Sequence, residues 1–201
     1  FVNLSNANGA NIADSQGLGT IVNDDVPPPT ITPIHTVQGS LVGTTPGSVN
    51  GCGSGNDSSP MCGQTVTVEA VVTATFPALA AGQLGGFNVQ EEDVDADQDD
   101  STSEGIFIYC PSCTGIKEGD RVRVTGTVAE FFGMTQISAL PAGVVVTEGA
   151  TNHLSEVTPA HITLPIPAGV DINAYYEARE GMLVQFDELT VSEYFQLFRY
   201  G

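Results

Sequence analysis

Basic side chains are scarce in this sequence: its 201 residues include five Lys and Arg against 24 Asp and Glu, a formal net charge of −19. Such a charge disfavours strong electrostatic binding of nucleic acid, because most of the surface repels phosphates. No apolar run approaches the roughly 18–20 residues of a membrane-spanning helix. The glycine loops of nucleotide-binding folds and the nucleophile turn of α/β-hydrolases are missing too. The sequence therefore does not indicate a membrane span or an enzyme of those two types.

The residues that are present predict an all-β fold. Hydrophobic residues make up 41 % of the chain, which is enough to build a core. With 23 Gly and 12 Pro, the sequence is rich in turns and poor in long helices. Val and Thr recur in alternating runs such as 64–76, and this period of two is typical of strands.

A compact β unit is expected between residues 64 and 149. Its apolar runs are short and lack helical periodicity. We predict strands at 64–76, 85–91, 105–110, 121–131 and 134–140, with a sixth run at 143–148. Five short strands at this spacing favour a five-stranded Greek-key barrel of the oligonucleotide/oligosaccharide-binding (OB) type. A generic β-sandwich is the alternative.

Residues 1–25 predict a hairpin, in which FVNLS and GTIVNDD are strands and NANGAN is a turn. The stretch resembles the last hairpin of a Calx-beta domain, a β-sandwich whose ending typically reads LSN…GA…GxGTIxNDD. The resemblance implies that Asp24 and Asp25 lie where that family often places calcium ligands. We expect a solvated strand end at these two residues, because the other ligands would lie before Phe1.

The hairpin is followed by residues 26–63, a linker that opens with VPPPTITP and continues rich in Gly and Ser. At the other end, residues 150–201 are expected to extend the β unit. This segment predicts one short helix at 171–179 and two strands after it. We expect the segment to lead to a further domain, because the run at FRYG reads as an interruption inside a sheet.

Residues 91–104 form the most distinctive local feature, EEDVDADQDDSTSE, which holds eight of the 24 acidic residues. Counted from Asp93, its acids and hydroxyl follow the ligand spacing of an EF-hand calcium loop. Gln98 stands where that loop usually has Gly, and strands replace the flanking helices. The alternative is an acidic loop without metal that aids solubility. The candidate calcium ligands are Asp93, Asp95, Asp97, Asp99, Ser101 and Glu104.

The four cysteines suggest two disulfides, because an even number is typical of secreted proteins. We favour the pairs Cys52–Cys62 and Cys110–Cys113. A four-cysteine zinc site is an alternative, although nine residues between Cys52 and Cys62 are too many for a zinc knuckle. A redox-active CPSC motif is another, but no thioredoxin-like pattern surrounds it.

Three of the five basic residues, Lys117, Arg121 and Arg123, lie within seven positions and are candidate phosphate contacts. They could equally pair with nearby acids on a solvated strand. Phe107 and Tyr109 are candidate platforms for base stacking, unless they point into the core in place of Ile106 and Ile108. Further aromatic candidates are Phe87, Phe131 and Phe132. The histidines His35, His153 and His161 are scattered, and no catalytic role is expected for them.

The order of motifs from residue 64 onward resembles secreted bacterial extracellular nucleases. These enzymes carry an OB-like domain ahead of an endonuclease/exonuclease/phosphatase-type catalytic domain. The matching segments are QTVTVEAVVTATF, LGGFNVQEEDVDADQDDSTSEGIFIYC, EGDRVRVTGTVAEFFGMTQIS and YYEAREGMLVQFDELTVSEYFQLFRYG. The resemblance implies that a metal-dependent catalytic domain would follow residue 201 and that this part of the chain contains no catalytic residues.

Two functions follow as hypotheses. In the first, the chain is the non-catalytic part of an extracellular nuclease and positions DNA or RNA for the downstream domain, with calcium stabilising the acidic loop. In the second, it is a calcium-binding structural spacer or adhesion-type module of a secreted bacterial surface protein. Only the first predicts binding to nucleic acid.

Overall fold

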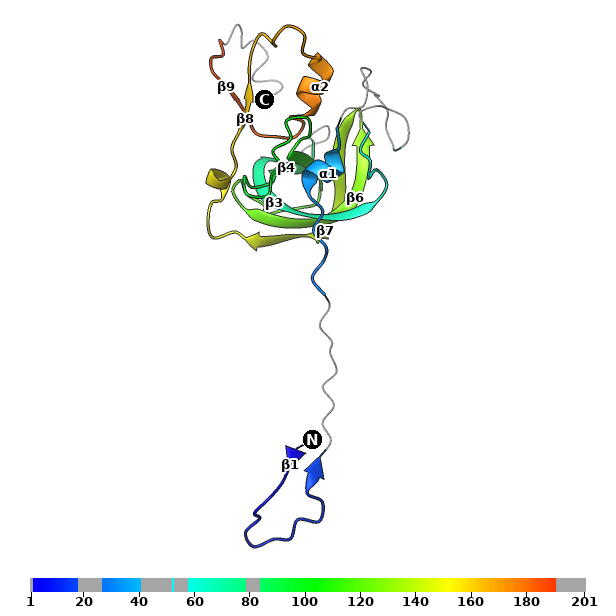
Figure 1. Cartoon of the computed structure of the whole chain (residues 1–201), viewed down its shortest axis with the longest axis vertical. Coiled ribbons are helices and arrows are strands. Elements are labelled where there is room, and N and C mark those ends of the chain that lie inside the picture. Colours follow the sequence, from blue (N-terminus) through cyan, green and yellow to red (C-terminus); the bar gives the residue numbers. More distant parts are fainter. Residues whose placement is uncertain (1, 18–26, 41–51, 53–57, 79–83, 191–201) are drawn as a thin grey trace.

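The computed structural model describes residues 2–17, 27–40, 52, 58–78 and 84–190 (Figure 1). These residues form nine strands, two short α-helices and one 3-10 helix. The all-β class predicted from the sequence is therefore confirmed. None of the described helices is long and apolar enough to span a membrane.

Five strands close into a ring in the order β3-β4-β5-β7-β6. Neighbours pair antiparallel except β5 and β7, which are parallel and close the ring. Four of the strands match the predicted positions to within one or two residues. The strands are β3 (Thr65–Phe76), β4 (Gly86–Gln90), β5 (Gly105–Tyr109), β6 (Arg121–Phe131) and β7 (Met134–Glu148).

Strand β7 replaces two separate predicted runs, 134–140 and 143–148. Its pairing with β6 is interrupted between Ala139 and Val144, where the register shifts. Pro141 lies in this interruption, and its missing N–H removes no ladder hydrogen bond because the residue is not paired with β6. Gly143 lies close to the backbone of β6, since a Cβ at this residue would be 2.4 Å from the Thr125 carbonyl oxygen. The irregularity therefore bends one continuous strand instead of ending it.

The core lies inside the ring and is built from alternate residues of the strands, including Val68, Ile108, Val124 and Ile137. Helix α1 (Ile34–Gln38) belongs to the same core, because Ile34 and Val37 are fully buried in it. Part of the segment predicted as a linker therefore packs against the ring (Figure 1).

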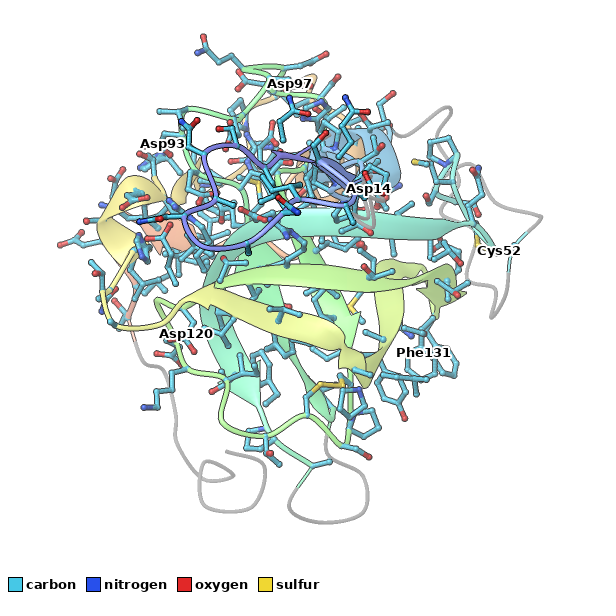
Figure 2. All side chains as sticks on the ribbon, turned by 90° about the horizontal axis from the view of Figure 1, so that it is seen from below. Asp14, Cys52, Asp93, Asp97, Asp120 and Phe131 are labelled. Atoms are coloured by element: carbon cyan, nitrogen blue, oxygen red, sulfur yellow. A yellow bond between two sulfur atoms is a disulfide. The ribbon has the colours of Figure 1, made fainter. Side chains whose placement is uncertain are left out.

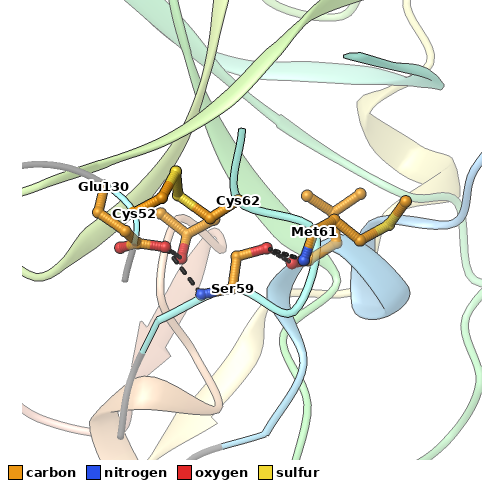
Figure 3. Close-up of a disulfide and its surroundings, with 7 residues drawn as sticks. Cys52, Ser59, Met61, Cys62 and Glu130 are labelled. Carbon is orange, nitrogen blue, oxygen red and sulfur yellow. Dashed lines mark hydrogen bonds between the residues drawn. A yellow bond between two sulfur atoms is a disulfide. The ribbon is translucent and has the colours of Figure 1, made fainter. Parts of the chain in front are cut away.

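Both predicted disulfides are present, Cys52–Cys62 and Cys110–Cys113, and no cysteine is free. Near the first disulfide, the Ser59 N–H donates to Glu130 Oε1 at 2.8 Å, and the Met61 N–H donates to Ser59 Oγ at 3.0 Å (Figure 3). The Ser59 hydroxyl donates to the Val37 carbonyl of α1. This segment thus connects α1 to the end of β6.

Two smaller sheets lie outside the ring. β1 (Val2–Asn3) pairs antiparallel with β2 (Gln16–Gly17), whereas the predicted second strand GTIVNDD, with Asp24 and Asp25, falls outside the described residues. β8 (Ala160–Ile162) pairs parallel with β9 (Val184–Phe186). Between these strands lies α2 (Ile172–Glu177), whose first turn is capped by the Asp171 carboxylate, close to the predicted helix 171–179.

Candidate functional site

The six predicted calcium ligands do not converge on one point. The Asp93 carboxylate accepts hydrogen bonds from the N–H and hydroxyl of Thr158, at 2.7 and 2.6 Å, which ties it to the segment before β8. Asp97 accepts from the Asp99 N–H, and Asp99 accepts from the N–H and hydroxyl of Ser101. These bonds to Ser101 hold the pKa of Asp99 below its usual range. The aspartates thus order the turn of the loop, and calcium binding by the six residues stays a prediction.

Glu104, from the end of the acidic loop, instead joins a cluster with Glu91 and His35. The His35 Nδ1 atom lies 3.3 Å from Glu104 Oε2 and 3.5 Å from Glu91 Oε2. One ligand atom from each of the three residues lies within 4.8 Å of the other two, so the group could hold a metal ion. Asp97 approaches the same imidazole, with Oδ2 3.8 Å from Nδ1. We call His35, Glu91 and Glu104 the acidic cluster.

Glu91 is the most unusual member of the acidic cluster, because it is only 5 % exposed. Its Oε1 accepts a hydrogen bond of 2.7 Å from the Ile34 N–H of α1, whereas its buried Oε2 has no hydrogen-bond partner. Burial, together with the neighbouring carboxyl of Glu104, raises the pKa of Glu91 to about 9. A buried carboxylate oxygen without a donor is unfavourable unless a proton or a cation compensates it.

Sequence reasoning missed two of the three residues in this cluster. No ligand pattern surrounds His35 in the sequence, and it is 69 positions from Glu104. Glu91 was counted as part of the acidic loop and not as a ligand. The sequence does place Glu91 and Glu104 directly beside predicted strands, which could have indicated that the two side chains lie close together. In the structure, the Glu91 N–H donates to the Glu104 carbonyl and holds both ends of the loop next to each other.

The arginines predicted to contact phosphates are engaged by carboxylates. Arg121 contacts Glu92, Glu148 and Glu156 at 2.5, 2.8 and 2.6 Å. Burial lowers the pKa of Arg121, but the three carboxylates outweigh it and raise the pKa above its usual value. Arg123 lies 2.6 Å from Glu69, its partner across β3 and β6. Lys117 is exposed in the loop before β6. Nucleic-acid contacts by these residues stay a prediction.

Of the candidate aromatic residues, Phe87 is buried in the core, and the others lie on the outer side of the ring. Ile106 and Ile108 are fully buried inside, so the alternation of β5 points Phe107 and Tyr109 outward. Phe76 shares this side, because it pairs with Gly86, which in turn pairs with Tyr109. We call the outward group the aromatic face; it consists of Phe76, Phe107, Tyr109, Phe131 and Phe132.

Exposure differs widely across the aromatic face. Phe107 is 4 % exposed and packs against Phe76, with ring centroids 6.4 Å apart, so its own ring is not accessible for stacking here. Tyr109 is 41 % exposed, and Phe131 and Phe132 at the β6–β7 turn are 49 % and 67 % exposed. Figure 2 shows Phe131 well separated from Asp93 and Asp97 of the acidic loop.

The β6–β7 turn holds its two rings in a specific arrangement. Phe131 and Phe132 pack edge to face with centroids 4.8 Å apart. Phe132 has a φ of 55°, in the left-handed region that a bulky side chain rarely adopts. Strained backbone of this kind clusters at sites that bind ligands, which marks the turn as a candidate contact surface.

Glu180 fixes the segment after α2 to the start of β7, since its Oε1 accepts a 2.8 Å hydrogen bond from the Thr135 N–H. Burial first, and then the carboxylates of Glu177 and Glu130, raise the pKa of Glu180 from 4.5 to about 8. In the unfolded chain the pKa returns to 4.5. The resulting stabilisation is therefore complete below pH 4.5 and is lost as the pH rises to about 8.

We expect Glu180→Gln to flatten this pH dependence, because the amide keeps the acceptor and does not ionise. Allowing for partial exposure, the stability lost between pH 5 and 8.5 should be about 2 kcal/mol smaller than in the wild type. Urea unfolding at the two pH values measures the difference. Glu188→Gln, at an exposed position, is the control and should behave like the wild type. Equal pH dependence in all three proteins would contradict the expectation.

Comparison with known proteins adds one relative. The chain is 27 % identical over 134 residues to Endonuclease YhcR of Bacillus subtilis (strain 168). The similarity indicates a nuclease-related region. The alignment covers 65 % of this chain and 10 % of the endonuclease, so the chain spans about a tenth of that relative's length. No protein-family model and no solved structure matches the chain.

Proposed function

We propose that the chain is a non-catalytic module of an extracellular nuclease and that it positions single-stranded nucleic acid for hydrolysis by another domain. The observation that carries the proposal is the similarity to Endonuclease YhcR over 65 % of the chain. The two disulfides support an oxidising, extracellular location. The first hairpin would then belong to a Calx-beta-like domain.

The proposal treats the five-stranded ring as an OB-like barrel. OB folds bind oligonucleotides across their second and third strands and through the loops after the first and fourth strands. Here these elements correspond to β4, β5, the segment between β3 and β4, and the β6–β7 turn. Of the aromatic face, Phe107 and Tyr109 lie on β5, and the β6–β7 turn presents Phe131 and Phe132.

Base stacking, and not phosphate attraction, is the mode of binding that fits these side chains. Arg121 and Arg123 are already paired with carboxylates, and the net charge is −19. Stacking contributes about 1–3 kcal/mol per base and tolerates any sequence. We therefore expect weak, sequence-tolerant binding of single strands with a shallow salt dependence. A cation bound in the acidic cluster would reduce the repulsion between the acidic protein and the phosphates of the nucleic acid.

The test replaces both exposed rings of the β6–β7 turn. We expect Phe131→Ala/Phe132→Ala to weaken binding of a labelled single-stranded DNA or RNA about tenfold or more, which corresponds to one stacked base. Fluorescence anisotropy at low salt measures the affinity. Tyr176→Ala, which removes a 49 % exposed ring of α2, is the matched control and should bind like the wild type.

A second candidate function, a structural spacer without nucleic-acid contact, is favoured by the engaged arginines. It predicts no binding by the wild type even at low salt. Equal binding by the double variant and the wild type would instead show that nucleic acid does not stack on the β6–β7 turn. Charge reversal of Arg121 is a poor test, because a fourth carboxylate beside Glu92, Glu148 and Glu156 would disturb folding.

A further inference from the structure

We propose that His35, Glu91 and Glu104 bind one divalent transition-metal ion of the Zn²⁺ class, which fastens α1 to both ends of the acidic loop. The inference is independent of whether the chain binds nucleic acid. These three ligands differ from the EF-like set of Asp93 to Glu104, because they include an imidazole nitrogen, whereas the EF-like ligands are all oxygen atoms.

The spacing of the three donors fits a small ion. Two ligand atoms that are each about 2.0–2.1 Å from a tetrahedral ion lie about 3.3–3.4 Å apart. The two separations from His35 Nδ1, 3.3 Å to Glu104 Oε2 and 3.5 Å to Glu91 Oε2, are close to this value. Asp97 Oδ2, at 3.8 Å from the same nitrogen, is placed to become a fourth ligand.

A second, independent observation is the unsatisfied oxygen of Glu91. The side chain is buried, its Oε1 is oriented by the Ile34 N–H, and its Oε2 points toward the imidazole without any hydrogen bond. Among the described residues this oxygen accepts no hydrogen bond, and His35 Nδ1, 3.5 Å away, is its ion-pair partner within the cluster. A cation between the three side chains satisfies the oxygen and offsets the repulsion between Glu91 and Glu104.

The chemical types of the three ligands, one imidazole and two carboxylates, also indicate which metal binds. Calcium and magnesium are hard ions that take oxygen ligands, whereas imidazole and carboxylate together suit zinc and similar ions. All four cysteines are in disulfides, so thiolates do not compete for zinc within this chain. The site is accessible from solvent, because the His35 side chain is 20 % exposed.

The ion would join three segments that are distant in the sequence. His35 belongs to α1, Glu91 directly follows β4, and Glu104 directly precedes β5. Helix α1 contributes Ile34 and Val37 to the core. Metal binding would therefore stabilise the packing of α1 against the ring and fix the base of the acidic loop, and it is expected to raise the melting temperature.

The experiment measures metal binding by the whole chain after treatment with a chelator and removal of the chelator. Calorimetric titration with Zn²⁺ is expected to show one site per chain. At a hundredfold excess over its Kd, Zn²⁺ should raise the Tm by about 5–10 °C. Ca²⁺ and Mg²⁺ at the same concentration should shift the Tm by less than about 1 °C.

Variants assign the site. His35→Gln and Glu91→Gln should each weaken Zn²⁺ binding about a hundredfold or more, because each removes a ligand. Glu91→Gln keeps the acceptor for the Ile34 N–H and should leave the metal-free Tm at or above that of the wild type, with an unchanged far-UV spectrum. His161→Gln and Glu118→Gln, at exposed positions outside the cluster, are matched controls that should retain the full Zn²⁺ response.

Three results would overturn the proposal. The first is a chain whose Tm and calorimetric signal do not respond to Zn²⁺. The second is a Zn²⁺ response of full size in His35→Gln and Glu91→Gln, which would place the ion elsewhere, for instance beside His153. The third is a larger response to Ca²⁺ than to Zn²⁺, which would favour an oxygen-only site in the loop.

Discussion

Replacing Arg121 by Ala is expected to lower the free energy of unfolding by about 3 kcal/mol, because it leaves a buried carboxylate without its partner. The Glu92 carboxylate is 6 % exposed and lies 2.5 Å from Arg121 Nε. The same guanidinium also holds Glu148 at the end of β7 and Glu156 in the following 3-10 helix, η1 (Leu154–Glu156). Chemical denaturation with urea measures the loss.

Arg123→Ala is the matched control for this prediction. Arg123 lies two residues away on β6, is 38 % exposed and pairs only with the partly exposed Glu69 among the described ion pairs. Exposed pairs contribute about 0–1 kcal/mol, so the control should lose at most about 1 kcal/mol. If both variants lose the same free energy of unfolding, Arg121 does not organise the carboxylates around it.

Gly86→Ala is expected to destabilise the protein by about 3 kcal/mol and to disturb the aromatic face. A Cβ at this residue would lie 2.1 Å from the Ile108 carbonyl oxygen and 2.6 Å from Phe107 Cζ. The first contact forces β4 away from β5, and the second displaces the Phe107 side chain, which packs against Phe76. Oligonucleotide binding should weaken along with the stability.

The control for Gly86 is Gly149→Ala. There the nearest atom to a new Cβ is a methyl carbon of the exposed Val146 side chain, at 2.9 Å, and this side chain can move. The expected change in the free energy of unfolding is within about 0.5 kcal/mol. A Gly86→Ala variant as stable as the wild type would contradict the pairing of β4 with β5, and with it the closed ring.

Most of the strands could be predicted from the sequence because β-branched residues recur in them with a period of two. The run Val122–Val128 buries alternate side chains, so local pattern and final structure agree there, whereas Val66–Val72 is buried on both faces. β7 could not be predicted as one strand, because Pro141 and Gly143 normally mark a break. Here the ladder with β6 tolerates them through a shift in register.

The acidic cluster could not be predicted for a different reason. Spacing within residues 91–104 predicts a loop in which neighbouring aspartates share one ion, and this stays a prediction; in the structure their carboxylates accept hydrogen bonds from nearby N–H groups and from Thr158. The cluster forms only after α1 packs into the core and brings His35 to Glu91 and Glu104. Contacts of this kind depend on tertiary packing, which a single sequence does not reveal.

The central claim is that single-stranded nucleic acid stacks on the aromatic face. Photo-crosslinking tests it most directly, with a single-stranded oligonucleotide that carries 4-thiothymidine, followed by mass spectrometry of the crosslinked peptides. We predict crosslinks to the peptides that contain Phe131 and Phe132 and to the peptide that contains Tyr109. Absence of crosslinks at all three residues, or crosslinks confined to the acidic loop, would contradict the claim.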